Sequence, residues 1–168
     1  MSFKDQLVDS SKVIVNMVAA NVGNNPVHYK EILDLVLNEP MPMSSRAGRV
    51  LNLCTENEPA LFQPYVNTVI NEIKKGKEVN RCILKIFAEL QIVLSKHQEG
   101  ILVNACFEWL ADESQSIAAK VYCMDILARF AEKEPGIIPE LIAVLEALLP
   151  HSSTGTKNRA SKIIRRFT

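Results

Sequence analysis

The sequence lacks the motifs by which most enzymes bind nucleotides or catalytic metals. Its six glycines are isolated, with no two closer than 19 residues, so no glycine-rich loop is present to wrap a phosphate group. The three histidines do not form a His-Glu-x-x-His motif. No two of the four cysteines have the short spacing that is typical of zinc sites. The sequence therefore predicts no catalytic residue, no cofactor and no metal site.

The sequence also lacks a hydrophobic run long enough to cross a membrane. Its longest uncharged stretch, residues 13–29, is interrupted by asparagines, a glycine and a proline, whereas a membrane-spanning helix needs about 20 apolar residues. Asp5 and Asp9 precede this stretch, where a secretory signal would carry positive charge. The four cysteines lie singly among aliphatic residues, as thiols do in a reducing compartment. We expect a cytoplasmic protein with reduced, mostly buried cysteines and no membrane contact.

Charge is balanced over the whole chain but not along it. Nineteen basic residues match nineteen acidic ones, a balance that does not favour nucleic acid or an anionic membrane as the partner. All the acids lie at or before Glu146, so residues 1–150, with 14 basic and 19 acidic residues, carry a net charge of −5. Residues 151–168 carry +5, from Lys157, Arg159, Lys162, Arg165 and Arg166.

Apolar residues recur at intervals of three and four, the period of amphipathic helices, without the sustained alternation that strands show. The 168 residues, of which 48% are hydrophobic and only 6% aromatic, suit one domain, 1–168, with an aliphatic core. Gly48 falls inside a predicted helix, where glycine costs about 1 kcal/mol relative to alanine, so we expect close helix packing there. The pattern predicts an all-α fold of nine helices, at 2–22, 26–38, 44–56, 60–75, 78–94, 98–111, 115–133, 137–149 and 154–167.

The helical pattern repeats along the chain. Residues 118–130 match residues 155–167 at an offset of 37. Each period holds two helices, neither of which can bury its apolar stripe alone, so stacking successive pairs makes one continuous core. Paired apolar residues mark the first helix of each period: Val13-Ile14, Val50-Leu51, Ile83-Leu84, Ile126-Leu127 and Ile163-Ile164.

Two stretches resemble HEAT-type repeats, which grade into armadillo repeats. The first stretch, residues 118–149, contains ILARF (126–130) and PELIAVL (139–145). The second contains RVLNLC (49–54) followed by PYVNTVI (64–70). As a type, the chain is also similar to short bacterial HEAT-like proteins. The resemblance implies a short right-handed α-solenoid of about four or five stacked antiparallel helix pairs, which serves as a non-enzymatic protein-binding scaffold.

The resemblance also implies where a partner binds. In HEAT proteins the second helix of each pair lines a concave surface, and here the second helices are those at about 26–38, 60–75, 98–111 and 137–149. The polar residues off their apolar stripes are Asn67, Asn71, Asn104, Glu108 and Glu140. Because these side chains are neutral or acidic, we expect a basic or amphipathic protein or peptide. Trp109, the single tryptophan, either fills a joint between repeats or serves as an exposed interface anchor.

The basic tail supports other hypotheses. Its helix is either a terminal cap, whose basic face meets an acidic body, or a surface for phosphate or an acidic partner. Some HEAT-like bacterial proteins bind DNA or are alkylpurine glycosylases with a basic channel, and this resemblance gives the alternative function. Self-association through an open end of the stack, as a homodimer, is a third hypothesis. A second basic cluster consists of Lys74, Lys75, Lys77 and Arg81.

Overall fold

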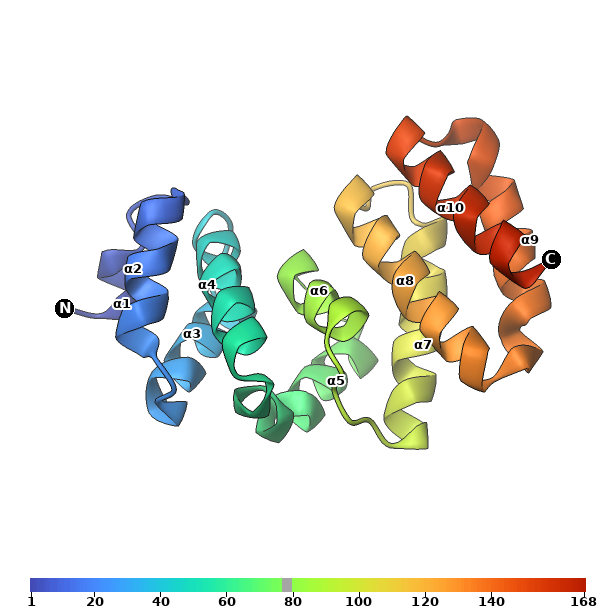
Figure 1. The fold of residues 1–168 in the computed structure, drawn as a ribbon. Coiled ribbons are helices and arrows are strands. Elements are labelled where there is room, and N and C mark those ends of the chain that lie inside the picture. The colour runs from blue at the N-terminus through green and yellow to red at the C-terminus, as the bar shows by residue number, and fades with distance from the viewer. Residues whose placement is uncertain (77–79) are drawn as a thin grey trace. The chain divides into compact units, whose positions relative to one another are not determined.

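The computed structural model describes residues 1–76 and 80–168, and no strand occurs among them (Figure 1). The all-α prediction is therefore confirmed for the described chain. The residues form two compact units, Met1–Leu94 and Ser95–Thr168. The single domain over 1–168 stays a prediction.

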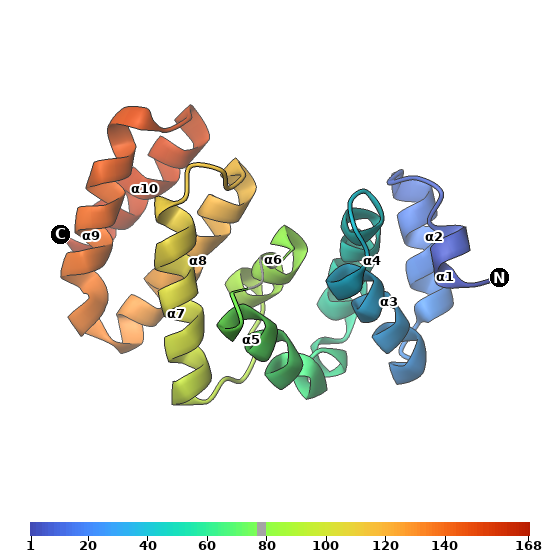
Figure 2. The ribbon, with the colours of Figure 1, turned by 180° about the vertical axis from the view of Figure 1, so that it is seen from behind.

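The first unit is built from two layers of helices. Helix α4 contacts both α2 and α6 in one layer and α3 in the other, and Figure 2 shows α3 and α5 from the side of that second layer. The layers arise because each helix has one apolar stripe to bury. The α-helices of this unit are α1 (Phe3–Gln6), α2 (Lys12–Val22), α3 (Pro26–Asn38), α4 (Met43–Asn57), α5 (Val66–Lys74) and α6 (Arg81–Glu89), with 3₁₀ helices η1 (Pro59–Leu61) and η2 (Gln63–Tyr65).

The second unit has the same two-layer arrangement. Helices α8 and α10 pack against each other, α7 contacts α9, and each layer contacts the other through α7 with α8 and through α9 with α10 (Figures 1 and 2). The helices of this unit are α7 (Lys96–Ala111), α8 (Ile117–Lys133), α9 (Ile138–Leu148) and α10 (Thr154–Phe167), with η3 (Pro135–Ile137) and η4 (Leu149–His151).

Helix α4 is held in register with α2 by two arginines. Arg46 Nη1 donates to the carbonyl oxygen of Leu7 at 3.0 Å, and Arg49 Nη1 donates to that of Ser10 at 2.6 Å. Both bonds join residues 39 positions apart. The start of α4 therefore lies beside the segment that leads into α2.

Helices α4 and α6 run parallel. Near the start of both helices, Asn80 Nδ2 donates to the Ser44 carbonyl oxygen at 3.2 Å. Further along both, Lys85 Nζ lies 3.1 Å from Glu56 Oε1. Contacts in this order require the two helices to run in the same direction, as the first helices of successive repeats do.

The paired apolar residues behave as predicted in the middle repeats and differ at the ends. The pairs at 50–51, 83–84 and 126–127 are at most 1% exposed, and Ile163 is 5% exposed. Ile164, in contrast, is only half-buried. The first pair was predicted wrongly, because Val13 is 76% exposed. Helix α2 instead buries Val15, Val18, Ala19 and Val22.

The predicted helix at 2–22 is two helices, so ten α-helices are described instead of nine. Asp9 Oδ1 accepts the backbone N–H of Ser11 at 2.7 Å, and the Ser11 hydroxyl accepts that of Ile14 at 3.3 Å. These bonds make Ser11 the N-cap of a new helix. The arginine bonds to the Leu7 and Ser10 carbonyls satisfy the backbone that the break exposes.

The predicted helix at 78–94 ends earlier, at Glu89. The segment that follows is extended and is bonded to a distant side chain: Gln63 Nε2 donates to the Val93 carbonyl oxygen at 2.9 Å, and Val93 N donates to Gln63 Oε1 at 3.0 Å. A capping box of Ser95 and Gln98 then starts α7 two residues before the predicted position. The predicted start at 78 lies outside the described residues.

Gly48 lies where α4 packs tightly against α6. A Cβ atom on Gly48 would lie 2.8 Å from Cys82 Sγ and 2.9 Å from Cys82 Cβ. The expected close packing around this glycine is therefore confirmed, and only hydrogen fits between the two helices at this point.

We predict opposite effects of alanine at two helical glycines. Gly48→Ala should lower the free energy of unfolding by about 1–3 kcal/mol, because the new methyl group overpacks the α4–α6 contact. Gly100→Ala, in α7, is the matched control: nothing lies within 4 Å of its Cβ position, so helix propensity should raise stability by up to about 1 kcal/mol. Urea unfolding of both variants measures the difference. A Gly48→Ala variant as stable as the natural protein would contradict this packing.

Candidate interaction surfaces

In the first unit, α5 turns two of the predicted binding residues outward. Asn67 and Asn71 are exposed, one turn apart on the helix, while Val66, Val69, Ile70 and Ile73 are buried on the opposite side. The amphipathic pattern predicted the solvent side of both asparagines correctly. Their role in binding stays a prediction.

In the second unit, α7 and α9 expose acidic side chains to solvent. Asn104 and Glu108 are exposed one turn apart on α7, and Glu140 and Glu146 are exposed on α9. Figure 2 shows α7 and α9 in the same layer of the unit. We call Asn104, Glu108, Glu140 and Glu146 the acidic face. Within the described chain, none of its three carboxylates forms an ion pair.

Trp109 lies on a different side of α7 from the acidic face. The residue is half-buried and falls one turn after Ala105 and two turns after Leu102, which are both buried. A side chain at this position points toward the neighbouring helices. This location fits the interpretation of Trp109 as a residue that fills a joint between repeats.

Helix α10 packs one face against the unit and anchors one flank to α8. Thr156, Ala160 and Ile163 form the buried face. On the flank, Arg159 makes a two-point pair with Asp125, with Nη2–Oδ2 at 2.7 Å and Nε–Oδ1 at 2.6 Å. Arg166 pairs with Glu132. Both pairs have the same separation in sequence, so α10 runs parallel to α8 in a fixed register.

The other three basic residues of α10 point to solvent. Lys157, Lys162 and Arg165 are exposed, and none of them forms an ion pair in the part of the chain that the structure describes. We call these three residues the basic face. In the second predicted cluster, Lys74, Lys75 and Arg81 are exposed. Lys75 Nζ lies 3.4 Å from Glu72 Oε1. Lys77 lies outside the described residues. Helix α10 thus makes the contacts expected of a terminal cap, and it also exposes three cationic side chains that form no ion pair in the described chain.

All four cysteines are free and buried, as predicted. Burial raises the pKa of the Cys54 thiol to about 11 and raises the pKa of Cys82 as well. The pKa of Cys106 is raised by burial first and then by the adjacent Cys123 thiol. Because only a thiolate is a good nucleophile, these thiols are poorly suited to nucleophilic catalysis at neutral pH.

A shallow depression lies between α4 and α6 in the first unit, where sequence reasoning did not predict one. Four polar residues, Asn52, Glu56, Lys85 and Glu89, line it together with the apolar Ile86 and Leu90. Lys85 Nζ lies 3.1 Å from Glu56 and 3.8 Å from Glu89. The buried Oδ1 of Asn52 has no hydrogen-bond partner in the structure. Its position in the apolar-rich RVLNLC segment is the only signal that a buried amide would occur here.

We predict that the pair of Arg159 with Asp125 helps to hold α10 in place. Both side chains are partly solvent-exposed, so Arg159→Gln should lower the free energy of unfolding by only about 0.5–1 kcal/mol. Asp125→Asn should cost about the same, and the double variant little more than either single one, because both changes remove one interaction. Lys162→Gln, on the basic face, is the control and should stay within about 0.5 kcal/mol of the natural protein. Strictly additive losses at Arg159 and Asp125 would contradict the pairing.

The described residues hold neither a membrane-crossing helix nor a metal-binding group. No helix among them combines the length and the apolar character that a membrane crossing requires. No group of three or more His, Cys, Asp or Glu side chains in the described chain is arranged to hold a metal ion.

The geometry of stacked, two-layer helix pairs agrees with the comparison with known families. The model of the HEAT repeat domain matches residues 3–166. The searches of curated proteins and of solved structures gave no match. Because the family model covers nearly the whole chain, and the helices stack as its repeats do, this chain belongs to the HEAT repeat family.

Proposed function

We propose that this chain is a non-enzymatic interaction module that binds a basic or amphipathic protein or peptide through its second helices. The acidic face of α7 and α9 is the observation that carries the proposal. HEAT domains are helical scaffolds that often mediate protein interactions, and the family membership supports this general role. The binding residues would be those exposed on α5, α7 and α9. Trp109 would not contact the partner directly but would pack between α7 and its neighbouring helices.

The charge of the acidic face supports a cationic partner. Glu108, Glu140 and Glu146 are exposed and have no ion-pair partner in the described chain, so a lysine or arginine of a ligand can approach them without displacing an internal contact. Charge complementarity of this kind increases association rate and selectivity more than it increases affinity. The partner would therefore bind in a salt-dependent manner.

The state of the thiols supports the non-enzymatic part of the proposal and the cytoplasmic location. Cys54, Cys82 and Cys106 have raised pKa values because they are buried, and buried free thiols suit a reducing compartment. The buried free thiols are the basis on which we propose a cytoplasmic location.

We predict that peptides selected from a random display library against the whole chain are enriched in Lys and Arg. Glu108→Lys together with Glu140→Lys should weaken their binding about tenfold or more, because attraction becomes repulsion at two positions. Glu113→Lys together with Glu134→Lys is the matched control: it changes the net charge equally at two exposed positions in the turns next to α7 and α8. Isothermal titration calorimetry measures both. Equal losses in the two double variants would show that net charge alone matters and would contradict the proposed surface.

A DNA-binding function or a glycosylase-type repair activity is the second candidate, supported by the basic face of α10. If nucleic acid is the partner, the chain should bind duplex DNA at micromolar concentration in about 0.15 M salt. Changing Lys157, Lys162 and Arg165 to Gln should then abolish binding, and each phosphate that is no longer neutralised should reduce the salt slope by about 0.9. We expect no such binding. Its observation, together with its disappearance in this triple variant, would favour the nucleic-acid function over the peptide-binding one.

A further inference from the structure

Helix α2 is apolar on both sides. Val15, Val18, Ala19 and Val22 are buried against the first unit. On the opposite side, Val13 is 76% exposed, Met17 is 45% exposed, and Ala20 is also exposed. We call Val13, Met17 and Ala20 the outer α2 face. Three apolar side chains in one stripe on the open side of a helix suit contact with a partner.

The spacing on this face is that of a helix–helix seam. Val13, Met17 and Ala20 are separated by four and then three residues, the alternation by which two parallel helices pack side by side. Lys12 is the only charged residue within α2. The face therefore carries no excess charge that would repel a second copy of itself.

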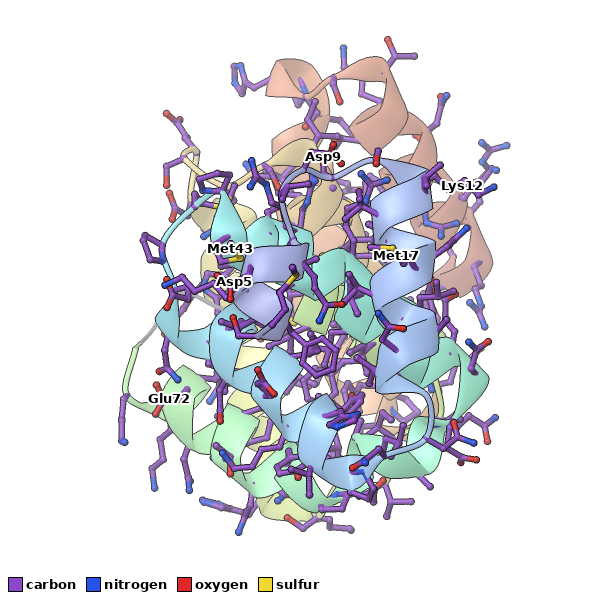
Figure 3. All side chains as sticks on the ribbon, turned by 90° about the vertical axis from the view of Figure 1, so that its left-hand side faces the viewer. Asp5, Asp9, Lys12, Met17, Met43 and Glu72 are labelled. Carbon is purple, nitrogen blue, oxygen red and sulfur yellow. The ribbon has the colours of Figure 1, made fainter. Side chains whose placement is uncertain are left out.

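Two charged residues flank the outer α2 face in a self-complementary way. Asp9 lies in the segment between α1 and α2, and Lys12 begins α2. Figure 3 looks onto this side of the first unit and shows Asp9 and Lys12 at the same end of α2, on either side of the line through Met17. A two-fold axis along that line would place Asp9 of each copy opposite Lys12 of the other, and would make two identical ion pairs.

We propose that the chain forms a parallel, two-fold symmetric homodimer through the outer α2 face. Val13, Met17 and Ala20 form the apolar seam, and two reciprocal pairs of Asp9 with Lys12 fix its register. The seam is only two helical turns long, so the interface is small and the association is weak and reversible. The seam uses no residue of α5, α7 or α9, so its variants test the dimer without changing the proposed peptide-binding residues.

Sedimentation velocity of the whole chain tests the apolar seam. Because small interfaces give weak complexes, the protein concentration is varied from about 5 to 500 μM. The natural protein should shift from monomer to dimer as concentration rises, and Met17→Glu should remain monomeric because two carboxylates would meet at the centre of the seam. Val27→Glu is the matched control: Val27 is 74% exposed, on α3, and its change should leave the dimer intact. A protein that is monomeric throughout, or a dimer that Met17→Glu does not affect, would overturn the proposal.

Charge reversal tests the two-fold pairing. Asp9→Lys and Lys12→Glu should each weaken the dimer about tenfold or more, because each places like charges opposite one another twice. The double variant restores both pairs and should recover most of the affinity. Since Asp9→Lys also removes the bond to Ser11, the melting temperature of each variant is measured in parallel. A double variant that is folded and as weak as the single ones would show that the proposed dimer is wrong.

Discussion

The packing of one first helix on the next is the contact on which the rest of the structure depends. Each amphipathic helix can bury its apolar stripe only against neighbouring helices, so no pair is stable alone. Gly48 shows how tight this contact is, because a single methyl group there would collide with Cys82. Arg46, Arg49, Asn80 and Arg159 then fix the register from one repeat to the next through bonds to backbone or carboxylate oxygens.

Stacking also determines which surfaces remain for binding. A helix whose apolar stripe is buried against its own unit offers polar side chains to a partner, as α7 and α9 do. A helix at the edge of a unit is covered on one side only. Helix α2 keeps an apolar stripe on its open side, whereas α10 presents charges there. The same architecture therefore accounts for a polar recognition surface, an apolar seam and a basic face on one short chain.

The period of apolar residues was sufficient to predict the helices, the repeat and the solvent side of α5 and α7. It worked for Val50-Leu51, Ile83-Leu84 and Ile126-Leu127, all of which are buried. It failed at Val13-Ile14, because an edge helix with two apolar stripes gives no local signal of which one is buried. The break before Ser11 and the end of α6 at Glu89 depend on Arg46, Arg49 and Gln63, which lie 30 to 39 residues away in sequence. The partners of Arg159 and Arg166 likewise required the register of α10 on α8.

Native-state hydrogen exchange of the whole chain, resolved by helix, tests most directly whether each unit is a stack held together by its first helices. In the first unit α4 has helices on both sides and α2 does not. In the second unit α8 buries seven residues, whereas α10 buries three. Amides of α4 and α8 should therefore exchange more slowly than those of α2 and α10, by about tenfold or more, because edge helices open without the rest. Equal protection of all four helices would contradict the account and would indicate a closed, fully cooperative bundle.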